Sequence, residues 1–219
     1  MSGAETPDAL KALRATVPHV YEAEAEGWAA RRARLAFLEQ PWIHCAIGGL
    51  SAGARVLDIG AGAGEPISAY LTERGLDVLG IDIAPAMVRL AEAHVPTAQW
   101  RVGDMRHLDL AERFAAIIGW DSFFHLAPGD QRATLPRLVR HLAPGGRLLL
   151  TVGPRACEAV GTVHGRPVYH ASLGAWEYTK IARRAGASHV SVSAEDPACD
   201  RRTLLLVEKA GARGAAQTD

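Results

Sequence analysis

Hydrophobic positions change their spacing along the chain, from a helical pattern in the first fifty residues to short apolar runs that alternate with helices. Leu10 and Val17 lie at helical spacing, and Pro18 is expected to interrupt that helix. A second helix is predicted over residues 19–40. Residues 1–50 are therefore expected to form a helical extension that covers the remainder of the protein.

Beyond this extension the pattern predicts strands and helices in alternation. Short apolar runs predict strands over residues 55–59, 77–82, 98–102, 114–120 and 147–152. Amphipathic stretches predict helices over residues 65–74, 85–95, 130–142 and 175–185, and two closing strands are expected over residues 190–194 and 203–208. Residues 153–170 are glycine-rich and are expected to be irregular, with a small hairpin around Gly165 as the alternative.

This order of elements indicates the fold class. Five strand–helix alternations predict a parallel sheet with helices on both faces, and right-handed crossovers make it a doubly wound, Rossmann-like α/β fold. With the two closing strands the sheet has seven strands, most of them parallel, and a ligand is expected beyond their carboxyl ends. Residues 51–209 would form this domain, and the small polar residues 210–219 are expected to be a disordered tail.

Composition narrows the class of protein further. The 219 residues carry 24 Lys and Arg against 24 Asp and Glu, and this zero net charge argues against a nucleic-acid partner. The three cysteines are scattered, and no run of about 18 apolar residues exists. We therefore expect no disulfide framework, no zinc site and no membrane span. The N-terminus does not resemble a signal peptide, so the expected compartment is the cytoplasm.

The sharpest chemical signal is a glycine-rich turn after the first predicted strand. The sequence from Val56 to Gly64 reads VLDIGAGAG, an acid followed by three alternating glycines, which permit a tight turn and close approach to a ligand. A dinucleotide-binding fingerprint needs a glycine where Glu65 stands, and an acid at that helix start is a poor partner for phosphate. Asp58, just before the turn, suits a cationic ligand end better.

The turn and the segments after it resemble the motifs of the class I S-adenosylmethionine-dependent methyltransferases. The family's first motif is an acid followed by G-x-G-x-G, matched here from Asp58 to Gly64. Its second acid, which contacts the ribose hydroxyls, is matched by Asp82 at the end of the second predicted strand. The adenine, substrate and fifth-strand motifs are matched in order by Gly103-Asp104-Met105, Trp120-Asp121-Ser122 and Leu142–Leu150.

A narrower resemblance is to a bacterial subgroup of small methyltransferases. It is carried by segments such as residues 120–126 (WDSFFHL) and residues 169–173 (YHASL). The chain departs from the subgroup at Ala61, where many members carry cysteine, and at Arg201-Arg202, where glycines are usual. Neither departure is expected to touch a cofactor contact.

The resemblance implies S-adenosylmethionine as the cofactor and a set of residues around it. The implied cofactor-binding residues are Tyr21, Trp28, Asp58, Gly60, Ala61, Gly62, Asp82, Ile83, Met87, Asp104, Met105, Arg106, Trp120 and Asp121. Arg32 and Tyr21 are candidates for the amino-acid end of the cofactor, with a surface charge as the alternative for Arg32. Trp28 has core packing as its alternative role, and Arg106 could pair with an acidic substrate or with Asp104.

The implied reaction is methyl transfer to an oxygen or nitrogen atom of a small molecule, for which the enzyme mainly aligns the nucleophile. A base is needed only for a protonated nucleophile, and the candidates are His125, Asp121 and His170. A buried, hydrogen-bonded role for His125 and a structural tether for His170 are the alternatives. The tetrad N-P-P-Y or D-P-P-Y is absent after the fourth strand, which argues further against a nucleic-acid substrate.

Other interpretations remain open from the sequence. We expect no metal, no nucleic acid and no membrane partner, and a monomer or homodimer. A non-catalytic protein that binds S-adenosylmethionine or S-adenosylhomocysteine is one alternative to the enzyme. A nucleotide-dependent oxidoreductase is the other, and Glu65 argues against it.

Overall fold

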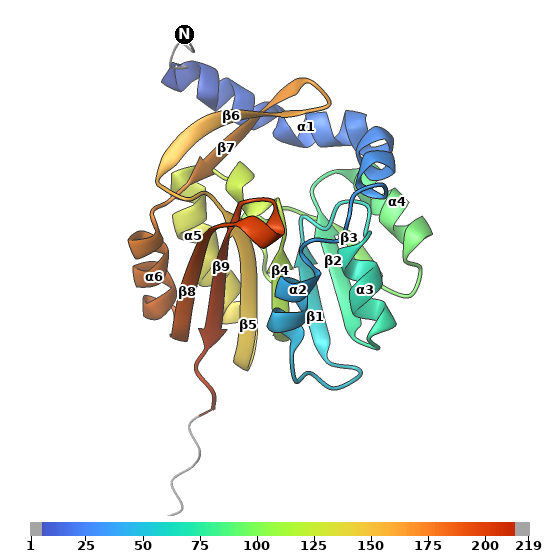
Figure 1. Cartoon of the computed structure of the whole chain (residues 1–219), viewed down its shortest axis with the longest axis vertical. Coiled ribbons are helices and arrows are strands. Elements are labelled where there is room, and N and C mark those ends of the chain that lie inside the picture. The colour runs from blue at the N-terminus through green and yellow to red at the C-terminus, as the bar shows by residue number, and fades with distance from the viewer. Residues whose placement is uncertain (1–5, 213–219) are drawn as a thin grey trace, which may run out of the picture.

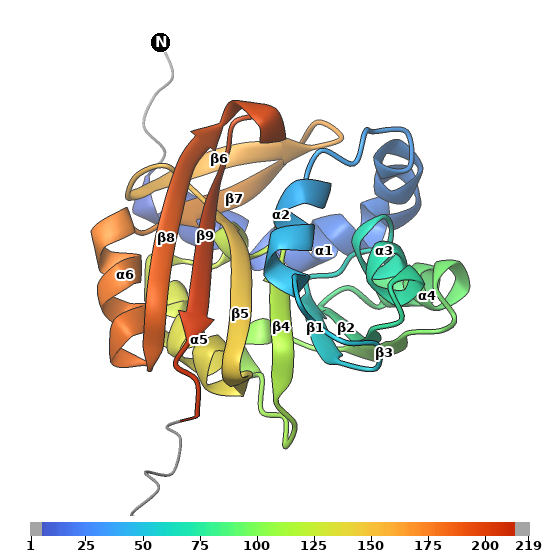
Figure 2. The ribbon, with the colours of Figure 1, turned by 60° about the horizontal axis from the view of Figure 1, so that its bottom comes forward.

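The computed structural model describes residues 6–212, and its centre is a seven-stranded sheet in the order β3-β2-β1-β4-β5-β9-β8 (Figure 1 and Figure 2). The strands are β1 (Arg55–Ile59), β2 (Asp77–Asp82), β3 (Gln99–Val102), β4 (Phe114–Gly119), β5 (Leu142–Val152), β8 (Ala187–Asp196) and β9 (Arg202–Lys209). Only β9 runs antiparallel to its neighbours β5 and β8. This topology confirms the predicted doubly wound, mostly parallel fold.

Helices cover both faces of the sheet. They are α1 (Pro7–Arg32), α2 (Gln40–Ile47), α3 (Ile67–Glu73), α4 (Pro85–His94), α5 (Pro128–His141) and α6 (Ala175–Arg184), with 3-10 turns η1 (Met105–His107), η2 (Phe123–His125) and η3 (Pro197–Cys199). Apolar residues of α2 and α3 pack with one face of the sheet, and those of α5 and α6 pack with the other. The inner strands β1, β2 and β4 are almost wholly buried, as expected of a parallel sheet, whereas the edge strands β3 and β8 are mostly exposed or half-buried.

The N-terminal extension differs from its prediction, because a single helix, α1, continues without a break past Pro18. A proline inside a helix removes a backbone hydrogen bond and costs about 3 kcal/mol. Here Val17 and Val20, on either side of Pro18, are buried against the rest of the protein, and this packing offsets the cost. The predicted interruption at Pro18 is therefore wrong. The predicted second helix is also wrong over residues 33–39, which form a loop before α2.

The glycine-rich segment predicted to be irregular is a regular β-hairpin, as the alternative had it, formed by β6 (Cys157–Val163) and β7 (Arg166–Ser172). His164 and Gly165 make its turn, both with positive φ, as a type I′ hairpin turn requires. Figure 1 shows the hairpin beside α1, above the ends of the central strands. Together they roof the carboxyl edge of the parallel strands, where a doubly wound fold binds its ligand.

The predicted boundary at residue 50 stays a prediction. α1 lies over the strand ends, whereas α2, on the same side of that boundary, packs against β4 and β5. The predicted tail, residues 210–219, lies mostly outside the described residues.

Candidate functional site

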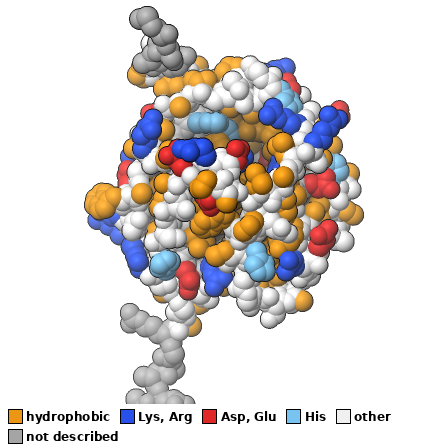
Figure 3. Space-filling model, viewed as in Figure 1, with side chains coloured by type: hydrophobic (Ala, Val, Ile, Leu, Met, Phe, Trp, Pro, Cys, Tyr) orange, Lys and Arg blue, Asp and Glu red, His pale blue; other side chains and the backbone are white. Residues whose placement is uncertain are grey.

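A cavity of about 490 Å³ lies between the carboxyl ends of the parallel strands and the roof formed by α1 and the hairpin. Figure 3 shows this face hollowed beneath α1, with hydrophobic side chains in the hollow and charged ones at its rim. The cavity brings together every candidate site residue from the sequence. Its lining includes Tyr21, Trp28, Asp58, Gly60, Ala61, Gly62, Asp82, Ile83, Met87, Asp104, Met105, Arg106, Trp120, Asp121, His125 and His170.

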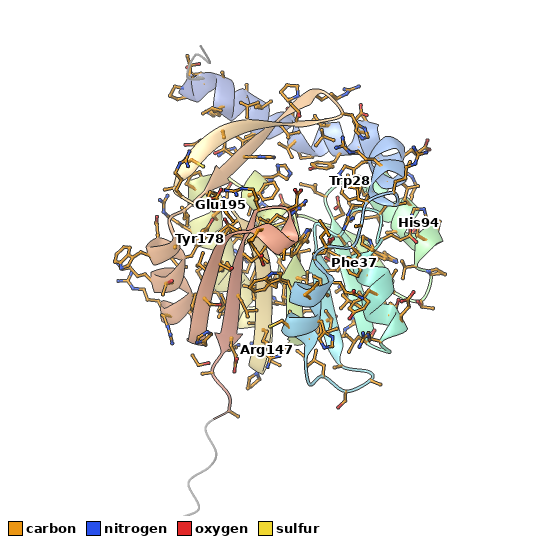
Figure 4. The ribbon with its side chains drawn as sticks, viewed as in Figure 1. Trp28, Phe37, His94, Arg147, Tyr178 and Glu195 are labelled. Atoms are coloured by element: carbon orange, nitrogen blue, oxygen red, sulfur yellow. The ribbon has the colours of Figure 1, made fainter. Side chains whose placement is uncertain are left out.

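The glycine turn after β1 forms the floor of the cavity. Its glycine positions leave no room for a larger side chain. Gly60 and Gly62 both have positive φ, which only glycine adopts without strain. A Cβ on Gly60 would lie 2.3 Å from the Cβ of Ser122, and one on Gly62 would lie 3.1 Å from the ring of Trp28. Trp28 reaches this turn from α1 (Figure 4). The glycines thus let the roof and the floor approach each other.

Two buried carboxylates flank the glycine turn. Asp82, at the end of β2, accepts backbone hydrogen bonds from Gly62 to Oδ2 and from Ala84 to Oδ1, both at 2.9 Å. Burial raises its pKa, and these backbone donors oppose the rise. Asp58 accepts a 2.8 Å bond from the Ser68 hydroxyl, and burial raises the pKa of Asp58 to about 7. Since each carboxylate oxygen has two lone pairs, Asp82 keeps acceptor capacity for a ligand with adjacent hydroxyls.

Asp104 and Arg106 form an ion pair just after the end of β3. The Arg106 Nη2 lies 2.6 Å from Asp104 Oδ2, and the Arg106 Nε donates to the same carboxylate. Burial raises the pKa of Asp104, but the bonds from the Arg106 side chain and backbone outweigh it and hold that pKa below its ordinary value. Of the two roles weighed for Arg106, the structure shows the pairing with Asp104.

Tyr21 and His125 meet in the roof of the cavity. The His125 Nδ1 lies 2.8 Å from the backbone oxygen of Tyr169, and a carbonyl can only accept, so Nδ1 carries the proton. His125 Nε2 is then the acceptor for the Tyr21 hydroxyl at 2.9 Å. Burial lowers the pKa of His125 to about 4, so this imidazole is neutral. Burial also raises the pKa of Tyr21.

His170 differs from His125 in its surroundings, although the two rings lie 4.9 Å apart. Its imidazole lies across Gly161 of the paired strand, where an added Cβ would be 2.3 Å away. Within residues 6–212, neither of its ring nitrogens has a hydrogen-bond partner. Burial lowers its pKa, and the charge of Asp121 opposes that effect. His170 therefore presents a neutral imidazole with free nitrogen atoms at the cavity.

Asp121 is held by a residue that the sequence prediction set apart from the site. Arg202 donates from Nε to both Asp121 carboxylate oxygens at 3.0 Å and from Nη2 to Oδ2 at 2.8 Å. Arg202 also lines the cavity and lies over the ring of Trp120, 5.9 Å from its centroid. Arg202 thus contacts Asp121, one of the implied cofactor-binding residues, although the change at Arg201-Arg202 was expected to touch no cofactor contact.

Arg32 and Glu39 form a second ion pair at the cavity, and of the two only Arg32 was a candidate site residue from the sequence. Arg32, at the end of α1, pairs with the buried Glu39 just before α2, and both line the cavity. Glu39 carried no signal in the sequence, because a lone acid between helices is ordinarily a surface residue. Its burial follows from the return of the chain beneath α1 after residue 32.

In residues 6–212 no helix has the length and apolar character that a membrane crossing needs. The same residues contain no group of three or more His, Cys, Asp or Glu side chains placed to hold a metal ion.

Comparison with known proteins finds methyltransferases that are similar to part of this chain. Residues 56–146 match the model of a methyltransferase domain. An uncharacterized methyltransferase of Mycobacterium bovis is 33% identical over 105 residues, 48% of this chain and 42% of that protein. A trans-aconitate 2-methyltransferase of Azoarcus sp. is 30% identical over 60% of this chain and 57% of that protein. The chain thus spans less than two thirds of the length of these curated relatives.

Solved structures agree with the fold. An amino pentose methyltransferase of Micromonospora echinaspora has a TM-score of 0.64 at 22% identity and covers 87% of this chain and 96% of its own. An N1-methyltransferase of Burkholderia thailandensis that acts on 1,6-didemethyltoxoflavin has a TM-score of 0.67 at 19% identity, covering 96% of this chain and 93% of its own. With the sheet order, these findings show that the chain has the fold of the class I methyltransferases and that residues 56–146 resemble a methyltransferase domain.

Proposed function

We propose that this chain transfers the methyl group of S-adenosylmethionine to an oxygen or nitrogen nucleophile of a small molecule. The observation that carries the proposal is the buried Asp82 carboxylate, fixed by the backbone of the glycine turn. It lies in the same cavity as the Tyr21–His125 pair. S-adenosylmethionine supplies an already activated methyl group, so the chain's own task is to bind, align and exclude water.

The cofactor-binding residues have separate tasks in this proposal. Asp82 accepts hydrogen bonds from the two ribose hydroxyls, since a carboxylate can accept several at once. Asp58 and the glycine turn face the methionine part, whose sulfonium and amino groups are cationic and stabilise the ionised form of a nearby acid. The adenine is bordered by Met105 and by the ion pair of Asp104 with Arg106. Arg32 stands near the cofactor carboxylate.

The acceptor side is formed by the roof. His125, Asp121 and His170 remain the candidate bases, and their surroundings rank them. Arg202 neutralises Asp121, and both nitrogens of His125 are engaged, which leaves His170 with free nitrogens. Small-molecule acceptors of the related methyltransferases support an acceptor of that size for this chain.

Two alternatives differ from this proposal in testable ways. A non-catalytic binder of S-adenosylmethionine or S-adenosylhomocysteine would have the same cofactor site and no turnover. A nucleotide-dependent oxidoreductase would bind NAD, and Glu65, which lines the cavity beside the turn, disfavours its phosphates. A cytoplasmic monomer or homodimer without a nucleic-acid partner is the accompanying proposal.

A transfer assay tests the activity directly. The protein is incubated with methyl-labelled S-adenosylmethionine and a small-metabolite extract, and label in the metabolites is measured. We expect incorporation by the wild-type chain and its loss in Asp82→Asn. The matched control is Asp77→Asn, at the opposite end of the same strand, where Asp77 pairs with Arg55. Cofactor binding without label transfer would favour the non-catalytic alternative.

A further inference from the structure

Four aromatic or imidazole rings form one wall of the cavity, on the side of the roof. Phe124 lies with its ring centroid 4.9 Å from His125 and 4.7 Å from His170, both edge to face. The two imidazoles are 4.9 Å apart, and the Tyr21 ring is 5.3 Å from His125. Edge-to-face packing of this kind fixes the rings and gives this side of the cavity a largely apolar lining.

This ring wall carries no charge at neutral pH. Burial lowers the pKa of both imidazoles, that of His125 to about 4, and burial also raises the pKa of the Tyr21 phenol. A charged ligand placed against the wall would lose its hydration without gaining a counter-ion, which is costly.

The charged side chains on the Asp130 side of the cavity are already paired with one another. Arg106 lies 2.6 Å from Asp104 and 3.7 Å from Asp130, and Arg14 lies 4.0 Å from Asp130. Two cations thus balance two anions. Arg31 is exposed to solvent at the rim rather than buried against the ring wall.

The charges on the opposite side are paired in the same way. Arg202 binds Asp121 through 2.8–3.0 Å contacts and reaches Asp200 at 3.2 Å, and the Asp200 side chain is 74% exposed. Arg32 is paired with Glu39. A carboxylate on the acceptor would have to break one of these pairs, leaving a partner uncompensated. Asp58 and Asp82, which have no cationic partner among residues 6–212, lie at the glycine turn and are assigned to the cofactor, so an ammonium group beside the ring wall would also have to break a pair.

His170 supplies the one polar feature that the ring wall leaves open. The Nε2 and Nδ1 atoms of His125 are used within the chain, whereas those of His170 have no partner among residues 6–212. A neutral imidazole offers one donor and one acceptor, which complements a hydroxyl group.

From the ring wall, the paired charges and the open His170 nitrogens, we infer that the methyl acceptor is an uncharged molecule with an apolar skeleton that presents a hydroxyl group to His170. This inference rests on the proposed function and makes oxygen, rather than an amine or a carboxylate, the atom methylated.

The chemical step balances with these groups alone. The hydroxyl oxygen forms a bond to the methyl carbon as the bond from that carbon to the sulfonium breaks, and sulfur keeps the electron pair. The hydroxyl proton passes to a free nitrogen of His170, which becomes an imidazolium and later releases the proton to solvent. The products are a methyl ether and S-adenosylhomocysteine.

A binding experiment with three probes of similar size tests the inference. Protein loaded with S-adenosylhomocysteine is titrated at pH 7.5 with 4-methylphenol, 4-methylbenzoate and 4-methylbenzylamine, which are neutral, anionic and cationic, and binding is followed by ligand-observed NMR. The same titrations are made with His170→Phe, which keeps a ring and removes the nitrogens. The matched control is His189→Phe, at an exposed position on β8.

We expect 4-methylphenol to bind at least about tenfold more tightly than either charged probe, and His170→Phe to weaken it about fivefold to tenfold while His189→Phe does not. Tighter binding of a charged probe, no binding of the phenol, or an affinity unchanged in His170→Phe would overturn the inference and leave the proposed function standing. Failure of the wild type to take up S-adenosylhomocysteine would reject the proposed function itself.

Discussion

Arg202 on β9 holds the Asp121 carboxylate by both of its oxygens, with contacts of 2.8–3.0 Å. The two residues lie 81 positions apart, and Asp121 sits at φ 47°, in the left-handed region that non-glycine residues rarely occupy. The ion pair therefore fixes a strained residue at the end of β4, where the substrate-facing motif begins. It also removes the free carboxylate that a general base would need.

A double-mutant cycle measures this pair. Both side chains are about 30% exposed, so we expect a coupling free energy of only about 1 kcal/mol between Arg202→Ala and Asp121→Asn. The free energy of unfolding is measured by urea denaturation for both single variants and the double variant. Strict additivity of the two single effects would show that the ion pair does not stabilise the fold.

The role of Asp82 is tested by cofactor affinity. Asp82→Asn removes the charge that would accept the ribose hydroxyls, and we expect binding of S-adenosylmethionine to weaken by about 1–3 kcal/mol. Titration calorimetry checks this, with circular dichroism to establish that the variant is folded. Asp77→Asn, at the exposed start of the same strand, should bind as the wild type does. Equal affinities for both variants would remove Asp82 from the site.

Gly62 and Gly53 form a matched pair for testing the approach of the roof to the glycine turn. Both have positive φ, so alanine strains both, by about 1 kcal/mol. A Cβ at Gly62 would also press on the Trp28 ring, whereas nothing lies within 4 Å of one at Gly53. We expect Gly62→Ala to weaken S-adenosylhomocysteine binding at least about tenfold and Gly53→Ala to leave it unchanged. Similar affinities would contradict the close packing of α1 on the turn.

The raised pKa of Asp58 predicts a pH dependence of stability. Its folded pKa of about 7 exceeds the ordinary 3.8, so between these pH values the native state binds a proton that the unfolded state releases. The contribution to stability is therefore present at low pH and falls as pH rises toward 7, by at most about 1.4 kcal/mol per unit. Above pH 7 it stays constant.

Asp58→Asn provides the reference, because it cannot titrate and keeps an oxygen acceptor for Ser68. The free energy of unfolding of each protein is measured from pH 5 to pH 8. We expect the wild type to lose stability relative to the variant up to about pH 7, with no further change above it. Parallel curves throughout would show that the carboxyl group keeps its ordinary pKa.

Glu24 joins α1 to the hairpin, since it lies 2.6 Å from Arg166 Nε and 3.2 Å from His164 Nδ1. Glu24→Gln removes the charge of this contact, and we expect amide hydrogen exchange in residues 157–172 to accelerate about twofold to fivefold. Glu26→Gln, at an exposed position of the same helix, is the control. Equal exchange in the two variants would show that Glu24 does not hold the hairpin against α1.

The sheet and its ligand edge could be predicted from sequence because buried parallel strands are nearly continuous apolar runs. The strands predicted over residues 55–59 and 77–82 are observed with those bounds. The fifth strand begins earlier than predicted, at Leu142, which pairs with Phe114 before a register shift. Local propensity gives no sign of this pairing, because the proline and glycines that follow favour a turn.

The roof and its ion pairs could not be predicted in the same way. The continuation of helix α1 across Pro18 depends on packing against the hairpin, which is a tertiary effect. Arg202 and Glu39 enter the site through contacts with residues distant in sequence, and neither has a local motif. The glycine turn and Asp82, by contrast, were predictable, because a strand end and a tight turn are local features.

Titration calorimetry with S-adenosylmethionine and, separately, with NAD tests whether the cavity is a methyltransferase cofactor site. We expect one S-adenosylmethionine to bind per chain and to be displaced by S-adenosylhomocysteine, with no measurable binding of NAD. Binding of NAD without binding of S-adenosylmethionine would contradict this expectation.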